Sequence, residues 1–185
     1  LGFKAGTMLG DGEPANDMIM AGLYGRYQLD AQWLIGFALD YSGFDFEAPN
    51  RIFGLVGSSV EVIDATTEAW YFTSWAEKQF DLENKRIKPF ILAELGVGFL
   101  DAEDVIIPLE GGGAADITTD AGTEFLIGVG CGVRYLFGNS WFIEPIVRFD
   151  HHFADWKVTE RNSAATQTID DYSTWAGQIG VGFSF

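Results

Sequence analysis

Residues 173–185, with the sequence STWAGQIGVGFSF, alternate between large apolar side chains and small or polar ones. One set of alternate positions holds Trp175, Gly177, Ile179, Val181, Phe183 and Phe185. The positions between them hold Ala176, Gln178, Gly180, Gly182 and Ser184. Successive side chains of an extended chain point to opposite faces, so this period of two residues predicts a β-strand with one strongly apolar face.

Seven earlier segments repeat the same alternation. They span residues 1–9, 18–29, 33–46, 67–82, 87–101, 124–137 and 141–158. In the clearest of them, Phe125, Val129 and Cys131 occupy one face, while Gly128 and Arg134 occupy the other. The pattern therefore predicts eight strands with no helical segment between them.

The connections between these segments alternate in length. Those at 30–32, 83–86 and 138–140 are tight, whereas 47–66, 102–121 and 159–172 are long and mostly polar. Short periplasmic turns and longer extracellular loops are typical of up-and-down barrels of the outer membrane. We therefore expect residues 1–185 to form one all-β domain, an eight-stranded antiparallel transmembrane β-barrel. The sequence does not indicate a role for the apolar patch at 52–56 in the first long connection.

The composition excludes several classes of function. The formal net charge of −16 argues against nucleic acid as a partner, because phosphate binding needs a clustered basic surface. No apolar run approaches the ~18 residues of a transmembrane helix, so a membrane crossing would have to use strands. The single cysteine, Cys131, excludes an intramolecular disulfide and a cysteine-built zinc site.

The less apolar face of the strands is rich in Gly, Ala and Ser and carries few charges. A face in contact with water would carry many more long charged side chains, whereas this mixture suits the interior of a narrow barrel. The side chains predicted to form an interior ion-pair network are Lys4, Arg26, Asp40, Glu77, Lys88, Glu94, Arg134, Glu144, Arg148, Asp150 and His152. Basic and acidic groups balance in this set, as buried ion pairs require. Lys78 is instead predicted to face outward near a strand end, where it can reach the membrane interface.

A last strand of alternating apolar residues that ends in Phe resembles the C-terminal strand of bacterial outer-membrane barrels. The whole alternating pattern is similar to that of small barrels of the OmpA-type or porin-like superfamily. The resemblance implies an integral outer-membrane location, removal of a signal peptide, and outer-membrane lipid and lipopolysaccharide as surroundings. It also implies recognition by the barrel-assembly machinery. The residues that would form this assembly signal are Trp175, Ile179, Val181, Phe183 and Phe185.

Candidate catalytic and metal-binding residues are few. His151 and His152 are adjacent on a strand and so face opposite sides, which excludes one site that contains both. Lipid A deacylases of the PagL type carry a His-x-Ser element on a late strand, but here Phe153 and Ala154 stand where the serine would be. We therefore predict no catalytic residue, no cofactor and no metal centre.

One acidic cluster could bind a divalent cation at the loop end. Asp101, Glu103 and Asp104 lie close together in the sequence, but their spacing does not match a calcium loop, so a solvated acidic rim is favoured.

The predicted function is a structural or surface-interaction role, with an interior filled by polar side chains. Eight strands enclose a space just wide enough for side chains to fill, so a general-diffusion porin is not expected. A narrow ion or small-solute channel is the first alternative. A lipid A-modifying enzyme and a soluble lipocalin-like carrier are further alternatives. The sequence names no partner for the extracellular loops.

Overall fold

The computed structural model describes residues 1–10, 15–49, 62–108, 114–120, 122–138, 140–161, 165–169 and 171–184. All regular structure in these residues is β, in agreement with the predicted fold class. Nowhere in the described residues is there a helix of the length and hydrophobicity that spanning a membrane requires.

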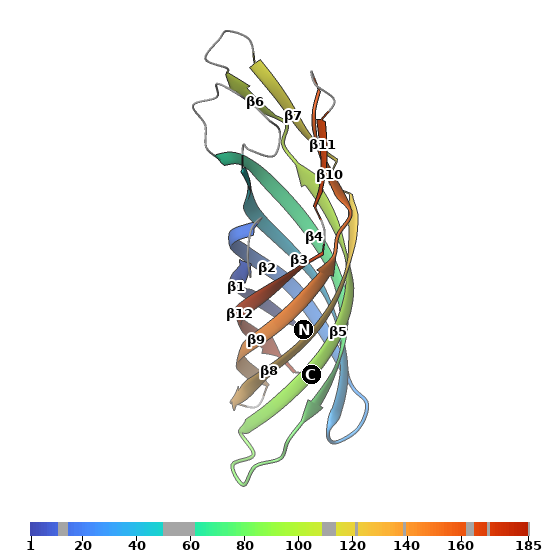
Figure 1. The fold of residues 1–185 in the computed structure, drawn as a ribbon. Coiled ribbons are helices and arrows are strands. Elements are labelled where there is room, and N and C mark those ends of the chain that lie inside the picture. The colour runs from blue at the N-terminus through green and yellow to red at the C-terminus, as the bar shows by residue number, and fades with distance from the viewer. Residues whose placement is uncertain are drawn as a thin grey trace.

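Eight long strands close into a barrel in which every neighbouring pair is antiparallel, as predicted (Figure 1). These strands are β1 (Gly2–Gly10), β2 (Ala15–Gln28), β3 (Trp33–Pro49), β4 (Val62–Gln79), β5 (Ile87–Ala102), β8 (Thr123–Phe137), β9 (Trp141–Phe153) and β12 (Tyr172–Phe183). The order around the barrel is β1-β12-β9-β8-β5-β4-β3-β2. Closure joins the first strand to the last, from Gly2 opposite Gly182 to Gly10 opposite Thr174.

Four shorter strands form a second sheet beyond one end of the barrel, at the top of Figure 1. They are β6 (Val105–Pro108), β7 (Ala114–Asp120), β10 (Trp156–Glu160) and β11 (Ala165–Ile169), in the order β11-β10-β7-β6. Two sequence predictions are therefore wrong: residues 102–121 and 159–172 are not plain loops, and 141–158 is not one strand. The break falls at Ala154, whose backbone N–H donates to Asp171 Oδ1 at 3.1 Å. The apolar patch at 52–56 lies outside the described residues.

The two faces of the barrel wall point as predicted. Phe125 and Val129 are 60% and 58% exposed on the outer surface, whereas Arg134 and Glu144 are 5% and 2% exposed. Large aliphatic and aromatic side chains are likewise exposed on every barrel strand. The barrel therefore encloses most of the charges of its strands and presents a mainly apolar surface outward.

The tight turns at the opposite end from the short sheet are held by local contacts. Asp30 Oδ1 accepts backbone N–H groups of Gln32 and Trp33 at 2.7 and 2.9 Å, which fixes the β2–β3 turn. Asn84 Oδ1 accepts the N–H of Arg86 at 3.0 Å in the β4–β5 turn. Gly138 begins the β8–β9 turn with φ of 64°, a conformation in which a Cβ is strained.

Candidate functional site: the polar interior of the barrel

The candidate site is the interior, because the ionisable side chains of the barrel strands gather there. Inward positions recur at every second residue, and small residues on the next strand make room for long side chains. Gly22 lies opposite Asp40, and Gly128 lies opposite Asp150. A Cβ at either glycine would overlap the carboxylate. The strand register thus places glycine where the interior acids need space.

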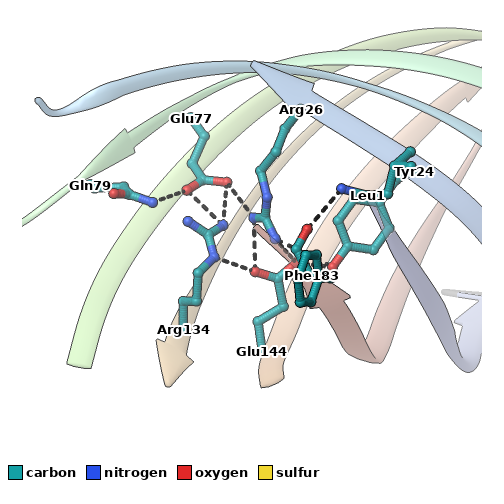
Figure 2. Close-up of polar contacts among 8 residues, drawn as sticks. All are labelled: Leu1, Tyr24, Arg26, Glu77, Gln79, Arg134, Glu144 and Phe183. Carbon is teal, nitrogen blue, oxygen red and sulfur yellow. Dashed lines mark hydrogen bonds and ion pairs between the residues drawn. The ribbon is translucent and has the colours of Figure 1, made fainter. Parts of the chain in front are cut away.

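The first group of interior charges, the turn-side layer, comes from four different strands (Figure 2). Arg134 lies between two acids, with Nε 2.7 Å from Glu144 Oε2 and Nη2 2.9 Å from Glu77 Oε1. Arg26 Nη1 lies 2.9 Å from Glu144 Oε2 and 3.7 Å from Glu77 Oε2. Tyr24 donates its hydroxyl hydrogen to Glu144 Oε1 at 2.6 Å. Four charges that alternate in sign thus link β2, β4, β8 and β9 across the lumen.

The second group, the middle layer, contains five charged side chains. Arg148 Nη1 lies 3.1 Å from Glu94 Oε2, and its Nη2 lies 2.9 Å from Asp150 Oδ2. Lys4 Nζ lies 2.8 Å from Asp40 Oδ2. All five side chains are almost completely buried, so each ion pair lies in a medium of low polarity, where loss of one partner is costly.

The third group, the loop-side layer, surrounds His152. Its Nδ1 lies 2.7 Å from Glu124 Oε1, and its Nε2 lies 3.2 Å from Thr174 Oγ1. The ring of Tyr172 stacks on the imidazole with centroids 4.4 Å apart, and its hydroxyl donates to Glu124 Oε2 at 3.1 Å. Tyr71 packs edge-on against the same imidazole at 5.9 Å. Aromatic rings therefore cap the ion pairs at this end of the lumen.

Little space remains between these layers. The cavity that Lys4, Arg26, Glu94 and Arg148 help to line holds about 20 Å³, which is room for about one water molecule. A wider vestibule of about 410 Å³ opens at the turn end, where Gln79 and Lys88 are among its lining residues. The described interior is thus filled in its middle and open at one mouth.

The structure brings most of the predicted interior residues together, with two differences. Lys88 is not part of the network, because its Nζ pairs with Asp81 at the turn end of the barrel. Glu124 was not in the predicted network but is fully buried beside His152. The predicted charge balance is therefore wrong within the described residues. The four permanent cations are Lys4, Arg26, Arg134 and Arg148, and the six carboxylates are Asp40, Glu77, Glu94, Glu124, Glu144 and Asp150.

Two acids in the turns have altered acidity. The backbone N–H groups of Gln32 and Trp33 hold the pKa of the Asp30 carboxyl below its usual range. The hydrogen bond from Lys88 lowers the pKa of the Asp81 carboxyl in the same direction. Both groups are exposed and belong to the turns, so their hydrogen bonds stabilise the turns locally.

The residues of the implied assembly signal lie mostly on the outer wall. Trp175, Ile179 and Val181 are exposed there, and Phe183 packs edge-on against Trp141 with ring centroids 5.4 Å apart. Phe185 lies outside the described residues. Their role in assembly stays a prediction.

The predicted acidic rim does not form a metal-binding cluster. Asp101, Glu103 and Asp104 are all exposed, and Asp104 is paired with Arg161 at 3.2 Å. The described residues contain no group of three or more His, Cys, Asp or Glu side chains that could hold a metal ion.

A histidine–serine contact that the sequence analysis did not anticipate lies on the outer wall. His151 Nδ1 is 3.0 Å from Ser173 Oγ on the neighbouring strand, and the His151 ring packs edge-on against Phe153. A nucleophilic serine needs a histidine base that a third group orients. In the described part of the chain, no carboxylate is hydrogen-bonded to His151, so the pair lacks that third group.

Comparison with known proteins adds information on the fold. No family profile and no curated protein matches the sequence. Among solved structures, the chain is similar to Neisserial surface protein A, with 16% identity and a TM-score of 0.53 over 97% of this chain and 92% of that one. It is similar to the outer membrane enzyme PagL, with 15% identity and a TM-score of 0.56 over 97% and 98% of the two chains.

A third similar structure is the outer membrane protein OprG from Pseudomonas aeruginosa. It is 7% identical, with a TM-score of 0.61 over 98% of this chain and 95% of that one. At these identities the likeness concerns the fold alone. The chain therefore has the fold of small outer-membrane β-barrels.

Proposed function

We propose that this chain, which has the fold of small outer-membrane β-barrels, is an integral outer-membrane protein with a structural or surface-interaction role. The proposal rests on one observation, which is that the outer wall of the barrel is apolar while its lumen is closed by ion pairs. The wall accounts for the membrane location, and the closed lumen accounts for a role that does not depend on transport.

The apolar wall is incompatible with water as its surroundings. Soluble proteins rarely expose contiguous apolar patches of more than a few hundred Å². Here Phe37, Leu95, Phe125 and Ile179, from four different barrel strands, are each more than half exposed. Contact with lipid removes the cost of this exposure, which also argues against a soluble lipocalin-like carrier.

Contact between the lumen and bulk solvent is limited by the turn-side and middle layers. A continuous water file would require Arg134 to leave Glu77 and Glu144, from which it is separated by 2.9 and 2.7 Å. The vestibule at the turn end supports a narrow channel as the second candidate, because part of an aqueous path is already open there. The cavity of about 20 Å³ between the layers favours the closed barrel.

The short sheet supports a role at the surface. Strands β6, β7, β10 and β11 extend past the barrel at the end away from the tight turns (Figure 1). On its polar face, Thr118, Thr159 and Thr166 follow one another directly across three strands. In an outer-membrane barrel this end is extracellular, so the polar face of the sheet would meet the outside medium. No enzymatic function is proposed, because no carboxylate among the described residues is hydrogen-bonded to His151 to orient the His151–Ser173 pair.

Two measurements test the proposal. The first is membrane fractionation followed by a detergent gel with and without boiling; a folded outer-membrane barrel should fractionate with the outer membrane and migrate differently before boiling. The second is conductance in planar bilayers. The closed barrel should be electrically silent, whereas discrete conductance steps that change on Arg134→Gln would favour the channel. A chain that stays in buffer without detergent would contradict the membrane location.

A further inference from the structure

A groove of about 540 Å³ crosses the outer wall of the barrel and belongs to none of the sites described above. Its volume is in the range of small-molecule sites. The small side chains of Ala76, Ala93 and Cys131 line it, and Trp33 and Trp175 stand among the larger residues along it. The groove is therefore a depression in a surface that is elsewhere covered by large apolar side chains.

The strand register gives the direction and length of the groove. Ala76, Ala93, Val129, Phe149 and Trp175 lie directly opposite one another on five neighbouring strands. Four interstrand spacings of ~4.8 Å make this row about 19 Å long. With the strands tilted by about 40°, the row rises about 12 Å along the barrel axis. One leaflet has about 15 Å of hydrocarbon, half of ~30 Å, so the row spans most of one leaflet.

A lysine stands at the turn end of the groove. Lys78 is one residue from the end of β4 and lines the groove, with Nζ 5.6 Å from the ring centroid of Trp33 and 5.9 Å from that of Phe80. Tryptophan and lysine side chains favour the membrane interface, the level of lipid phosphates. Among the described outward-facing residues of the barrel strands, Lys78 is the one with a permanent positive charge.

Other basic residues lie on the same hairpin. Lys85 and Arg86 are exposed in the turn that joins β4 to β5. Four of the 11 basic residues of this strongly acidic chain fall between residues 78 and 88. The same stretch holds two acids, Glu83 and Asp81, of which Asp81 pairs with Lys88. Four basic residues less two acids leave a net charge of +2 at the turn end below the groove, which complements an anionic headgroup.

We propose that this groove binds an anionic glycerophospholipid of the leaflet at the turn end of the barrel. One acyl chain lies along the row of Ala76 and Ala93, and the ammonium group of Lys78 binds the phosphate. The inference rests on the proposed outer-membrane function, in which the tight turns are periplasmic and the leaflet around them consists of phospholipid.

A lipid fits this groove better than a second copy of the chain does. A symmetric dimer places the same patch on both partners, so two Lys78 ammonium groups would enter one apolar interface. The described lining contains no acidic side chain that could pair with them. A lipid phosphate supplies that missing negative charge.

Native mass spectrometry of the full chain in detergent micelles tests the inference. Palmitoyl-oleoyl phosphatidylglycerol and the corresponding phosphatidylcholine are each titrated into the protein. The wild type should retain one phosphatidylglycerol, and it should bind phosphatidylcholine about five-fold more weakly, the effect expected of one lysine near an anionic surface. Lys78→Gln should remove this preference, and Ala93→Phe, which fills the groove, should weaken the binding of both lipids.

Matched controls separate the site from general effects. Lys157→Gln removes one positive charge from the short sheet, and Ala5→Phe adds the same ring to the outer face of β1, so neither should change lipid binding. Heat-modifiable migration of every variant checks folding. A folded barrel without a preference for phosphatidylglycerol overturns the lipid site alone, whereas a chain that never folds into micelles overturns the proposed function. A dimer that Ala93→Phe abolishes, or equal retention of lipid A, would also contradict the lipid site.

Discussion

Replacement of Arg148 by methionine should strongly destabilise the barrel, because two buried acids share this one guanidinium. Nη1 lies 3.1 Å from Glu94 and Nη2 lies 2.9 Å from Asp150, and the arginine side chain is 4% exposed. Methionine retains a flexible apolar stem, so the main change is the loss of charge. The two carboxylates would then lie in the lumen with no guanidinium between them.

The size of the effect follows from burial. Removal of one partner from a buried ion pair costs about 3–5 kcal/mol, because the remaining charge is left uncompensated. Arg161→Met is the matched control, since Arg161 also bridges two acids, Asp104 at 3.2 Å and Asp116 at 3.0 Å, but its side chain is 57% exposed. Each exposed pair contributes about 0–1 kcal/mol, so loss of both Arg161 pairs should cost at most about 2 kcal/mol, and the two variants should differ by at least about 1 kcal/mol.

The assay is urea unfolding of each variant refolded into phosphatidylcholine vesicles, followed by tryptophan fluorescence. Glu94→Gln and Asp150→Asn, added together to Arg148→Met, should restore most of the lost stability, because no charge then remains unpaired at this point. If Arg148→Met costs no more than Arg161→Met, or if the added neutral amides restore nothing, the reasoning about the middle layer is wrong.

Three further outcomes are expected. Gly128→Ala should destabilise the barrel by about 1–3 kcal/mol in the same urea assay, because a Cβ would overlap Asp150, whereas Gly177→Ala, with open space around it, should have little effect. Asp30→Ala should lower stability at pH 7, and its difference from the wild type should vanish in acid. The pKa of Asp30 is lower in the folded protein than in the unfolded chain, so its carboxylate stabilises the fold at any pH above the pKa of the unfolded chain. This stabilisation is lost as the pH falls through the pKa of the folded protein, and a pH-independent difference would contradict this. Lipid A incubated with the purified barrel should keep its mass, and loss of an acyl chain that depends on His151 would contradict the non-enzymatic role.

The barrel could be predicted from the sequence because its signal has a period of two residues and persists along every long strand. At the loop end the same signal gave a wrong prediction, because it joined β9 and β10 into one strand. In the segment from His152 to Val158 the alternation of buried and exposed side chains continues without a change of phase across the break between β9 and β10. A change of pairing partner leaves no trace in such a pattern, so the short sheet could not be separated from the barrel.

Most members of the interior network could be predicted from the sequence, but the members near the ends of the strands could not. Lys88 is on the inward phase of β5, yet it lies close enough to the turn to reach Asp81. Glu124 is also near a strand end, and its burial depends on the rings of Tyr172 and His152 above it. These contacts join a strand to its turn, as Lys88 to Asp81, or one strand to another, as Glu124 to His152 and Tyr172, and the alternation within a single strand does not contain that information.

Tryptophan quenching by lipids with brominated acyl chains tests most directly which face of the wall meets hydrocarbon. Two single-tryptophan variants are needed, one that keeps Trp175 on the outer wall and one that keeps Trp75, which packs inside against Tyr24 at a centroid distance of 6.1 Å. In vesicles of the brominated lipid, Trp175 should be strongly quenched and Trp75 should not. Quenching of Trp75 with Trp175 unaffected would mean that the barrel wall is oriented the other way round.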